Sequence, residues 1–208
     1  GVRLMTVIGH VSDYFAEKHN MALPSGVPTA VARSLLDGLA VVLPAVDSGM
    51  NFLQEVARQD TSEGLHWTLP TGMKVYHVYR KYNEVRVMVK SAGISRLRIR
   101  DAGEGINKRG SVDAISPNYI HSLDAAHITM VGNAAYQAGL SMVGVHDSMG
   151  THPSDVHHLL HLIKDCFIKL YKHDLLGDFK RETGTNVPLP TMGKLDINRV
   201  HDSSYFFC

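Results

Sequence analysis

Apolar residues recur at helical spacing through the N-terminal part of the chain. The first run repeats every three or four residues and predicts a helix that ends near His19. A second run predicts a helix over residues 29–43, and Pro44 should end or kink it. A third helical pattern continues from Val46 to Val56. We interpret all three as helical core or scaffold. The inward-facing residues of the second helix are expected to be Leu35, Leu36, Leu39 and Val42.

Alternation of apolar and polar residues then replaces helical spacing. Residues 66–79 predict a β-hairpin around the turn sequence Pro70-Thr71-Gly72. Two further alternating segments, 85–90 and 94–100, predict a longer β-ribbon. We expect the glycine-rich stretch 101–110 to form the flexible tip of that ribbon.

Two more helices are indicated by their start and stop signals. Ser116 is a typical N-cap, Pro117 fits the first helical position, and Gly139 is typical of the residue after a helix end. Ser154 is expected to cap a later helix that runs to about His173. The apolar stripe of that later helix is Val156, Leu159, Leu160, Ile163, Phe167 and Leu170. The Pro- and Gly-punctuated residues after it should pack back onto the fold.

A short apolar run between these helices carries a His-Asp pair at its end. The run Met142–Val145 predicts a buried strand, His146 and Asp147 follow it in a tight turn, and Gly150 and Pro153 stop it. A carboxylate at the end of a buried strand is costly unless something pairs with it. A divalent metal such as Mg²⁺ is the usual partner. From strand chemistry alone, a surface turn that caps the next helix stays open as the alternative.

The predicted ribbon concentrates positive charge. Residues 80–110 contain nine Lys or Arg and three Asp or Glu, a local formal charge of +6 in a chain whose total is +1. In a strand, Arg96, Arg98 and Arg100 would share one face at intervals of about 7 Å. Arginine suits both phosphates and the guanine edge in the major groove. From the residues alone, a DNA-contacting ribbon and a charged edge strand that resists aggregation both stay open.

Other features narrow the class of protein. Two cysteines in 208 residues form no disulfide framework and fit a reducing compartment. No apolar stretch approaches the roughly 20 residues that span a bilayer. His157 and His161 stand one helical turn apart, a spacing at which two histidines can bind zinc. Because no Cys or Glu completes a recognised zinc site, a solvated helix face is the better interpretation. His127 is expected to be a packed helix residue.

An ordered set of motifs resembles the C-terminal part of the single-subunit, bacteriophage-type DNA-directed RNA polymerases. The resemblance is strong over residues 67–208 and weaker over 1–64. Met149 stands where the family usually has an aromatic residue. The motifs are Ser116-Pro117-Asn118-Tyr119-Ile120-His121-Ser122-Leu123-Asp124, His146-Asp147-Ser148, Gly177-Asp178-Phe179-Lys180, Leu189-Pro190-Thr191-Met192-Gly193-Lys194-Leu195-Asp196-Ile197 and the terminal Ser204-Tyr205-Phe206-Phe207-Cys208.

The resemblance implies roles for particular residues. Asp147 would be one of two metal-binding aspartates in a two-metal mechanism with Mg²⁺, and His146 would orient the turn or contact the product end. His121 would lie near the incoming ribonucleotide and sense its 2′-hydroxyl. The ribbon would align with the loop that reads promoters. Its DNA-binding residues would be Arg96, Arg98, Arg100, Lys108 and Arg109.

The resemblance also implies an α+β fold that is part of a right-hand polymerase. Residues 1–64 would form a helical fingers-side segment. Residues 65–183 would form a palm segment, with the DNA-contacting ribbon at about 84–112 and the metal turn at 145–151. Residues 184–208 would form the C-terminal tail, or foot, which packs near the active site in the family.

The expected activity is template-directed transfer of ribonucleotides from NTPs, with promoter DNA, template and nascent RNA as partners. The family places a second catalytic aspartate, and a fingers helix with a Lys and a Tyr, upstream of such a segment, and neither is found in this chain. The chain begins with Gly1, so we expect a C-terminal portion that is inactive without an upstream polymerase segment. The bacterial cytoplasm of a phage host is the expected location, with a mitochondrial origin as the alternative.

Two other functions are compatible with these residues. One is a non-catalytic DNA-binding or regulatory fragment that keeps the ribbon and lacks the chemistry. The other is a metal-dependent phosphohydrolase that uses His146 and Asp147. Such His-Asp pairs normally sit in a helix with further His ligands nearby, whereas this pair follows a strand-like run.

Overall fold

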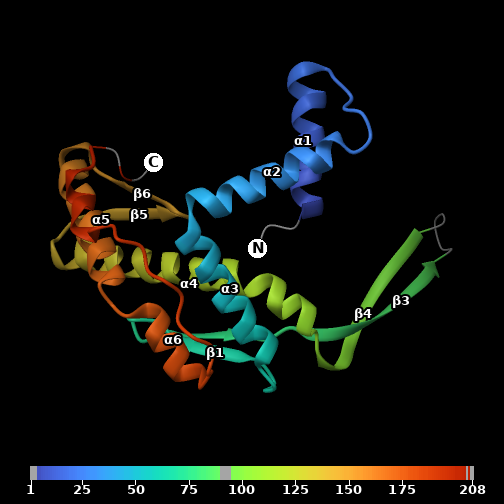
Figure 1. Cartoon of the computed structure of the whole chain (residues 1–208). Coiled ribbons are helices and arrows are strands. Elements are labelled where there is room, and N and C mark those ends of the chain that lie inside the picture. Colours follow the sequence, from blue (N-terminus) through green and yellow to red (C-terminus); the bar gives the residue numbers. More distant parts are fainter. Residues whose placement is uncertain (1–3, 90–94, 205, 207–208) are drawn as a thin grey trace. The chain divides into compact units, whose positions relative to one another are not determined.

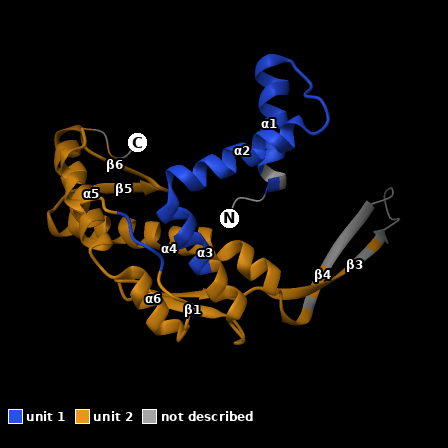
Figure 2. Cartoon of the chain, viewed as in Figure 1, with its two compact units in different colours: residues 1–53, 190–193 blue, residues 54–189, 194–208 orange. Residues whose placement is uncertain are grey.

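The computed structural model describes residues 4–89, 95–204 and 206, without the side chains of residues 5, 6, 86, 88, 89, 95–99 and 102. It mixes helices with small antiparallel sheets, which confirms the predicted α+β class (Figure 1). Two compact units divide the chain (Figure 2). The first contains residues 1–53 and 190–193, and the second contains residues 54–189 and 194–208.

The three N-terminal helices form where the apolar spacing predicts them. Helix α1 spans Leu4–His19, α2 spans Val27–Val42 and α3 spans Pro44–Gln59. Helix α2 begins two residues earlier than predicted, because proline fits the first turn of a helix and Pro28 is therefore admitted there. Pro44 likewise opens α3, so the predicted break falls between the two helices.

Burial on α2 differs from the prediction. Leu35, Leu39 and Val42 are 57%, 50% and 74% exposed, and Ala32 is the buried residue of this helix. Helix spacing reports which residues share a face, and it does not report what covers that face. No single helix in the described part of the chain is long and apolar enough to cross a membrane, and α2 and α3 would reach that length and composition only jointly, as a bent pair.

The larger unit is built around the long helix α4, Lys108–Gln137. A hairpin of β1 (Leu65–Thr68) and β2 (Lys74–His77) and the helix α6 (Leu175–Thr183) pack beside it. Trp67, which is 1% exposed, lies between Tyr119 of α4 and Phe179 of α6, with ring centroids 5.7 and 5.6 Å away. The predicted hairpin is confirmed, and its alternating inner side chains form this core.

A second core lies farther along α4, where α5 (Val156–Tyr171) packs against it. Its buried residues are Val131, Leu159, Ile163 and Cys166. The 3-10 helix η2 (Ile197–Asp202) packs along α5, and Phe206 joins the same core. The expectation that the tail packs back is therefore confirmed. In the predicted stripe of α5, Val156 is the exception and is 50% exposed.

Three local start and turn signals were misinterpreted. Helix α4 begins at Lys108, with the Asn107 side chain accepting a hydrogen bond from the Gly110 amide at 3.0 Å, and Pro117 lies inside the helix. Burial of the turns on both sides of Pro117 holds α4 together, although the proline ring removes one backbone hydrogen bond. Asp155, not Ser154, stands at the N-cap position of α5, after the 3-10 turn η1 (Pro153–Asp155). Gly139, with φ +71°, follows the end of α4 as predicted.

The ribbon is formed by β3 (Arg80–Val89) and β4 (Ser95–Ile106), and its glycines lie elsewhere than predicted. Residues 101–106 continue strand β4, so 101–110 is not the tip. Val89 pairs with Ser95, and residues 90–94 between them lie outside the described part of the chain. The glycines instead serve a register shift opposite Arg80–Tyr82 at the root of the ribbon. A Cβ on Gly103 would lie 3.0 Å from the Lys81 carbonyl oxygen.

Candidate functional site

The His-Asp pair occupies the two central positions of a tight hairpin. Strand β5 (Met142–Val145) pairs with β6 (Ser148–Thr151), and Val145 is directly opposite Ser148. His146 has φ +56°, in the left-handed region that costs an L-residue on the order of 1–2 kcal/mol. Such outliers persist where the surrounding structure holds them, and they cluster at functional sites. The predicted tight turn is confirmed.

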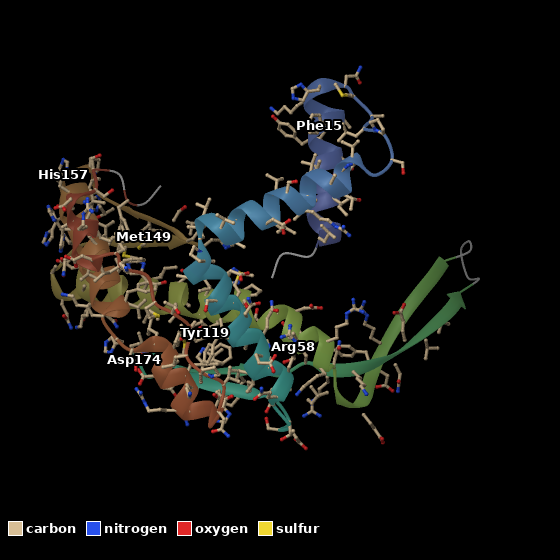
Figure 3. All side chains as sticks on the ribbon, in the orientation of Figure 1. Phe15, Arg58, Tyr119, Met149, His157 and Asp174 are labelled. Carbon is tan, nitrogen blue, oxygen red and sulfur yellow. The ribbon has the colours of Figure 1, made fainter. Side chains whose placement is uncertain are left out.

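The predicted burial of this strand is wrong. Val143 and Val145 are each 61% exposed, and Asp147 is exposed with them. Side chains alternate across a hairpin, so one face carries Met142 and Met149 inward and the other faces solvent (Figure 3). An apolar run alone does not reveal whether both faces are covered. Asp147 therefore avoids the desolvation cost from which its metal role was first inferred.

The donor set at the turn fits one ligand of a hard cation. The Asp147 carboxylate is exposed in the turn of the β5–β6 hairpin, and carboxylate oxygen is the ligand type that Mg²⁺ prefers. The N-cap positions of η1 and α5 belong to His152 and Asp155, so Asp147 is not the helix cap that was the alternative. Among the described residues, no group of three or more His, Cys, Asp or Glu side chains could hold a metal ion. The turn can supply one carboxylate to a shared site.

The motif Ser116–Asp124 forms the middle of α4 and is divided between two faces. The buried face contains Ser116, Tyr119, Ser122 and Leu123. The opposite face exposes His121 and Asp124 one turn apart. The Tyr119 hydroxyl donates to the Leu175 carbonyl at 2.9 Å, and burial raises the pKa of Tyr119. The inner face is thus fixed by packing and hydrogen bonds, and His121 is free to meet a ligand from solvent.

A buried polar network behind this motif was missed in the sequence. His77 is 2% exposed, and its Nε2 lies 3.0 Å from the Ser111 carbonyl oxygen while its Nδ1 lies 3.2 Å from the Asn118 amide nitrogen. The same amide donates to the Tyr79 hydroxyl at 3.0 Å. These partners assign the Nε2–H tautomer of a neutral imidazole. Burial lowers the pKa of His77, against the opposing hydrogen bond to Ser111.

The sequence contains one weak indication that His77 is buried and hydrogen-bonded. It occupies an inward position in the alternation of β2, where a polar residue needs partners. Its partners Ser111 and Asn118 are 34 and 41 residues away in the chain, so no local pattern identifies them. His127 is buried with its Nε2 2.9 Å from the Ile163 carbonyl oxygen, which confirms the packed role predicted for it.

The basic ribbon is described only in part. Arg100 is exposed, and Glu84 is its direct cross-strand partner, so its local charge is partly balanced. The side chains of Arg96 and Arg98 lie outside the described residues, and the prediction that the three arginines share a face stays a prediction. Lys108 and Arg109 are exposed in the first turn of α4, at the root of the ribbon and not at its tip.

The candidate residues are spread along α4 and do not share one pocket. The ribbon joins the beginning of α4, and the β5–β6 hairpin packs near Val131, close to its other end (Figure 1). At 1.5 Å per residue, Lys108 and Val131 are roughly 35 Å apart along the helix. His121 lies between them, roughly 15 Å of helix from Val131. Helix α4 therefore sets the spacing between ribbon and turn.

A cavity of about 410 Å³ lies elsewhere, between β1 and α6. Its charged groups are already paired. The Glu182 carboxylate accepts from the Thr68 amide at 2.6 Å and the Thr68 hydroxyl at 2.7 Å. Arg181 donates to Asp174 at 3.3 Å and also to Asp178. This arrangement fastens α6 to β1 and engages the Arg181 and Glu182 side chains of the cavity in structural contacts. His157 and His161 are both exposed on α5, as the solvated-face interpretation predicts. His157 is labelled in Figure 3.

Comparison with known proteins gives a consistent result over nearly the whole chain. A family model described as DNA-dependent RNA polymerase matches residues 9–188. The DNA-directed RNA polymerase of Pseudomonas phage phiKMV is 31% identical over 216 residues, covering 100% of this chain and 26% of the phage protein. The DNA-directed RNA polymerase 2A of Nicotiana tabacum is 33% identical over 190 residues, covering 88% of this chain and 56% of the plant protein. The chain thus spans about a quarter of the phage relative and about half of this plant relative.

Proposed function

Because the chain belongs to the DNA-dependent RNA polymerase family, we propose that it supplies the C-terminal portion of a polymerase that transfers ribonucleotides from NTPs on a DNA template. The observation that carries the proposal is the position of Asp147, at the solvent-exposed end of a hairpin whose inner face is packed into the core. A carboxylate so placed is both rigid and accessible. Those are the properties a metal ligand needs when the other ligands come from elsewhere.

Asp147 would hold Mg²⁺ together with carboxylates from outside the described residues. When bound, a pair of such ions neutralises charge on the attacking and departing oxygens of the phosphoryl transfer. The left-handed backbone at His146 turns the chain so that Asp147 stands at the hairpin end. The His146 imidazole next to it would orient the turn or contact the product end.

His121 and the ribbon would handle the other substrates. The exposed imidazole of His121 can donate or accept a hydrogen bond to a ribose 2′-hydroxyl, which distinguishes ribonucleotides from deoxyribonucleotides. The ribbon joins the first turn of α4, and the hairpin that carries Asp147 packs near Val131, roughly 35 Å farther along that helix. Duplex DNA would meet the ribbon while the growing end lies at the turn.

The wider organisation is proposed on the same resemblance. Residues 1–64 would belong to the fingers side, 65–183 to the palm and 184–208 to the terminal foot. A location in the cytoplasm of a bacterial phage host stays a prediction, because the relatives include phage and plant organellar polymerases. The regulatory-fragment alternative keeps the ribbon and predicts no synthesis in any context. The phosphohydrolase alternative requires several His or Asp ligands near Asp147, and the described residues offer no such group.

The test replaces one carboxylate oxygen without changing the shape of the turn. In a polymerase that contains this chain, Asp147→Asn should lower the rate of single-nucleotide addition by about 10²–10³-fold, since single electrostatic groups that stabilise the transition state contribute on this scale. Template binding should stay within threefold. The matched control is Asp13→Asn, an exposed aspartate of α1. Addition by Asp147→Asn within a few-fold of the parent would refute the metal-ligand role.

A second arm separates the catalytic proposal from the regulatory alternative. The purified 208-residue chain should show no NTP-dependent synthesis, because one carboxylate does not hold two metal ions. Adding a polypeptide that carries the upstream polymerase segment should restore synthesis. Failure to restore it, with both parts folded and associated, would favour the regulatory fragment.

A further inference from the structure

Lys164 is a buried cation that neither the motifs nor the proposed chemistry explains. It lies on α5, two helical turns after the exposed His157 and on the same side of that helix, yet it is only 6% exposed. Its Nζ donates to the Ser203 carbonyl at 2.5 Å and to the His201 carbonyl at 3.3 Å. A buried ammonium is strongly unfavourable without such acceptors, so the two carbonyls and the Lys164 cation hold one another in place.

The two carbonyls belong to the segment that follows η2, so Lys164 fixes the path of the chain there. A second bond supports the same segment, because His201 Nε2 lies 3.3 Å from the neighbouring Asp165 carboxylate. That pair is about half exposed and contributes little by itself. The charge-assisted bonds of Lys164, shielded from water, are the stronger restraint.

Three residues past Ser203, Phe206 enters the second core. Its ring lies 5.0 Å from that of Phe167, nearly edge-to-face at 76°. It packs against the same buried cluster as Met142 and Met149, the two inward side chains of the β5–β6 hairpin. The tail and the hairpin thus share one apolar core, and the turn that carries Asp147 directly precedes the strand of Met149.

We propose that Lys164 is a positioning residue for the Asp147 turn. By holding the Ser203 and His201 carbonyls, it keeps Phe206 seated in the buried cluster against which Met142 and Met149 also pack. The filled cluster then keeps the two-stranded hairpin in one orientation. An isolated two-stranded hairpin is marginally stable, so its inner face needs this cover. The proposal rests on the proposed function of Asp147 for its catalytic consequence, and the structural part can be tested without it.

The structural arm measures backbone amide hydrogen exchange on the full 208-residue chain. Lys164→Met keeps the aliphatic stem and removes the cation. It should raise exchange about tenfold in η2 and also in β5–β6, because loss of a buried charge-assisted bond has an effect of this order. Lys169→Met, an exposed lysine on the same helix, is the matched control and should change neither segment more than twofold.

Phe206→Ala removes the packing of the tail in the buried cluster and leaves the hydrogen bonds of Lys164 to the segment after η2 in place. It should raise exchange in β5–β6 and leave η2 within twofold of the parent. The double variant should raise hairpin exchange no further than the larger single change, because both act through one contact. Faster exchange in η2 with an unchanged hairpin would overturn the positioning role. Unchanged exchange in η2 of Lys164→Met would show that Lys164 does not restrain this segment, which overturns the proposal as well. Global unfolding of Lys164→Met would assign Lys164 to general stability and likewise overturn the proposal.

The catalytic arm uses a polymerase that contains the chain. Lys164→Met should lower kcat for nucleotide addition about tenfold and leave the KM for NTP within twofold, since the substrate pocket is not touched. Lys164→Arg, which keeps the charge, should recover most of the loss. If Asp147→Asn has no effect on synthesis while the exchange results are as expected, the proposed function is wrong and the structural role of Lys164 in holding the tail is kept. If the exchange results fail, the inference fails whatever the activity shows.

Discussion

Removal of Phe179 should detach α6 from the body of the larger unit. The side chain is 2% exposed, and its ring lies 5.6 Å from Trp67 and 5.1 Å from Tyr119. Truncating a fully buried Phe to Ala costs about 3–5 kcal/mol, which includes the transferred surface and the cavity left behind. The upper half of this range is expected here, because two aromatic neighbours lose their partner together.

The chain contains its own reporter for this loss. Trp67 is the sole tryptophan of the sequence and is in ring contact with Phe179, so its fluorescence follows the larger unit alone. Urea unfolding should be monitored by this signal and by far-UV circular dichroism, since the two compact units need not unfold together. With a slope of about 2 kcal/mol per M, a loss of about 4 kcal/mol lowers the urea midpoint by about 2 M.

Two controls bracket the result. Phe179→Leu keeps most of the apolar volume and should cost about 1–2 kcal/mol. Tyr76→Ala removes a ring that is 70% exposed on the outer face of the same hairpin, and it should change stability by less than about 0.5 kcal/mol. A midpoint shift below about 0.5 M for Phe179→Ala, or equal shifts for Phe179→Ala and Tyr76→Ala, would show that α6 does not depend on this core.

Three further predictions concern charge. Burial lowers the pKa of His77 below its ordinary value of 6.5, so between that pH and the lower folded-state pKa the unfolded chain binds a proton that the folded chain does not. The free energy of unfolding should therefore fall as the pH drops through this window. His77→Gln should lose this pH-dependent component, and identical pH profiles for the parent and the variant would contradict the neutral tautomer. Glu182→Gln should lower the free energy of unfolding by about 0.5–1.5 kcal/mol by weakening the bonds to Thr68. Glu63→Gln, at an exposed glutamate shortly before β1, should not lower it. Arg100→Ala in the polymerase should reduce the slope of log duplex affinity against log salt concentration by about one unit, or relax specificity at one promoter position. Unchanged binding to promoter and random duplex would refute DNA contact by Arg100.

Helix spacing and hairpin turns could be predicted because their signals are local. The end of α1 at His19 and the hairpin around Pro70-Thr71-Gly72 follow from residues within a few positions of one another. The start of α4 could not be predicted in the same way. Ser116 and Pro117 carry a strong local start signal, and the burial of Ser111 and Ile115 in the preceding turns outweighs it.

The candidate site was recognisable by motif and not by the physical argument first applied to it. Asp147 was selected as a buried carboxylate, and it is exposed, because the outer face of β5–β6 has no cover among the described residues. The glycines at 103 and 105 indicated a tip and instead serve a register shift at the root of the ribbon. The local sequence correctly indicated an apolar strand at 142–145 and conformational freedom at the glycines of β4. Which face of the strand is covered, and where in the ribbon the glycines lie, depends on pairing and packing with residues far away in the sequence.

The most direct test of the metal role is cleavage of the protein backbone by a bound ion. In a polymerase that contains this chain, Fe²⁺ would replace Mg²⁺, and peroxide with ascorbate would generate hydroxyl radicals at the ion. The account predicts cuts within residues 145–149, suppressed by excess Mg²⁺ and lost in Asp147→Asn. Cuts of equal strength in Asp147→Asn, or a cleavage pattern that leaves residues 145–149 intact, would contradict the claim that Asp147 binds the catalytic metal.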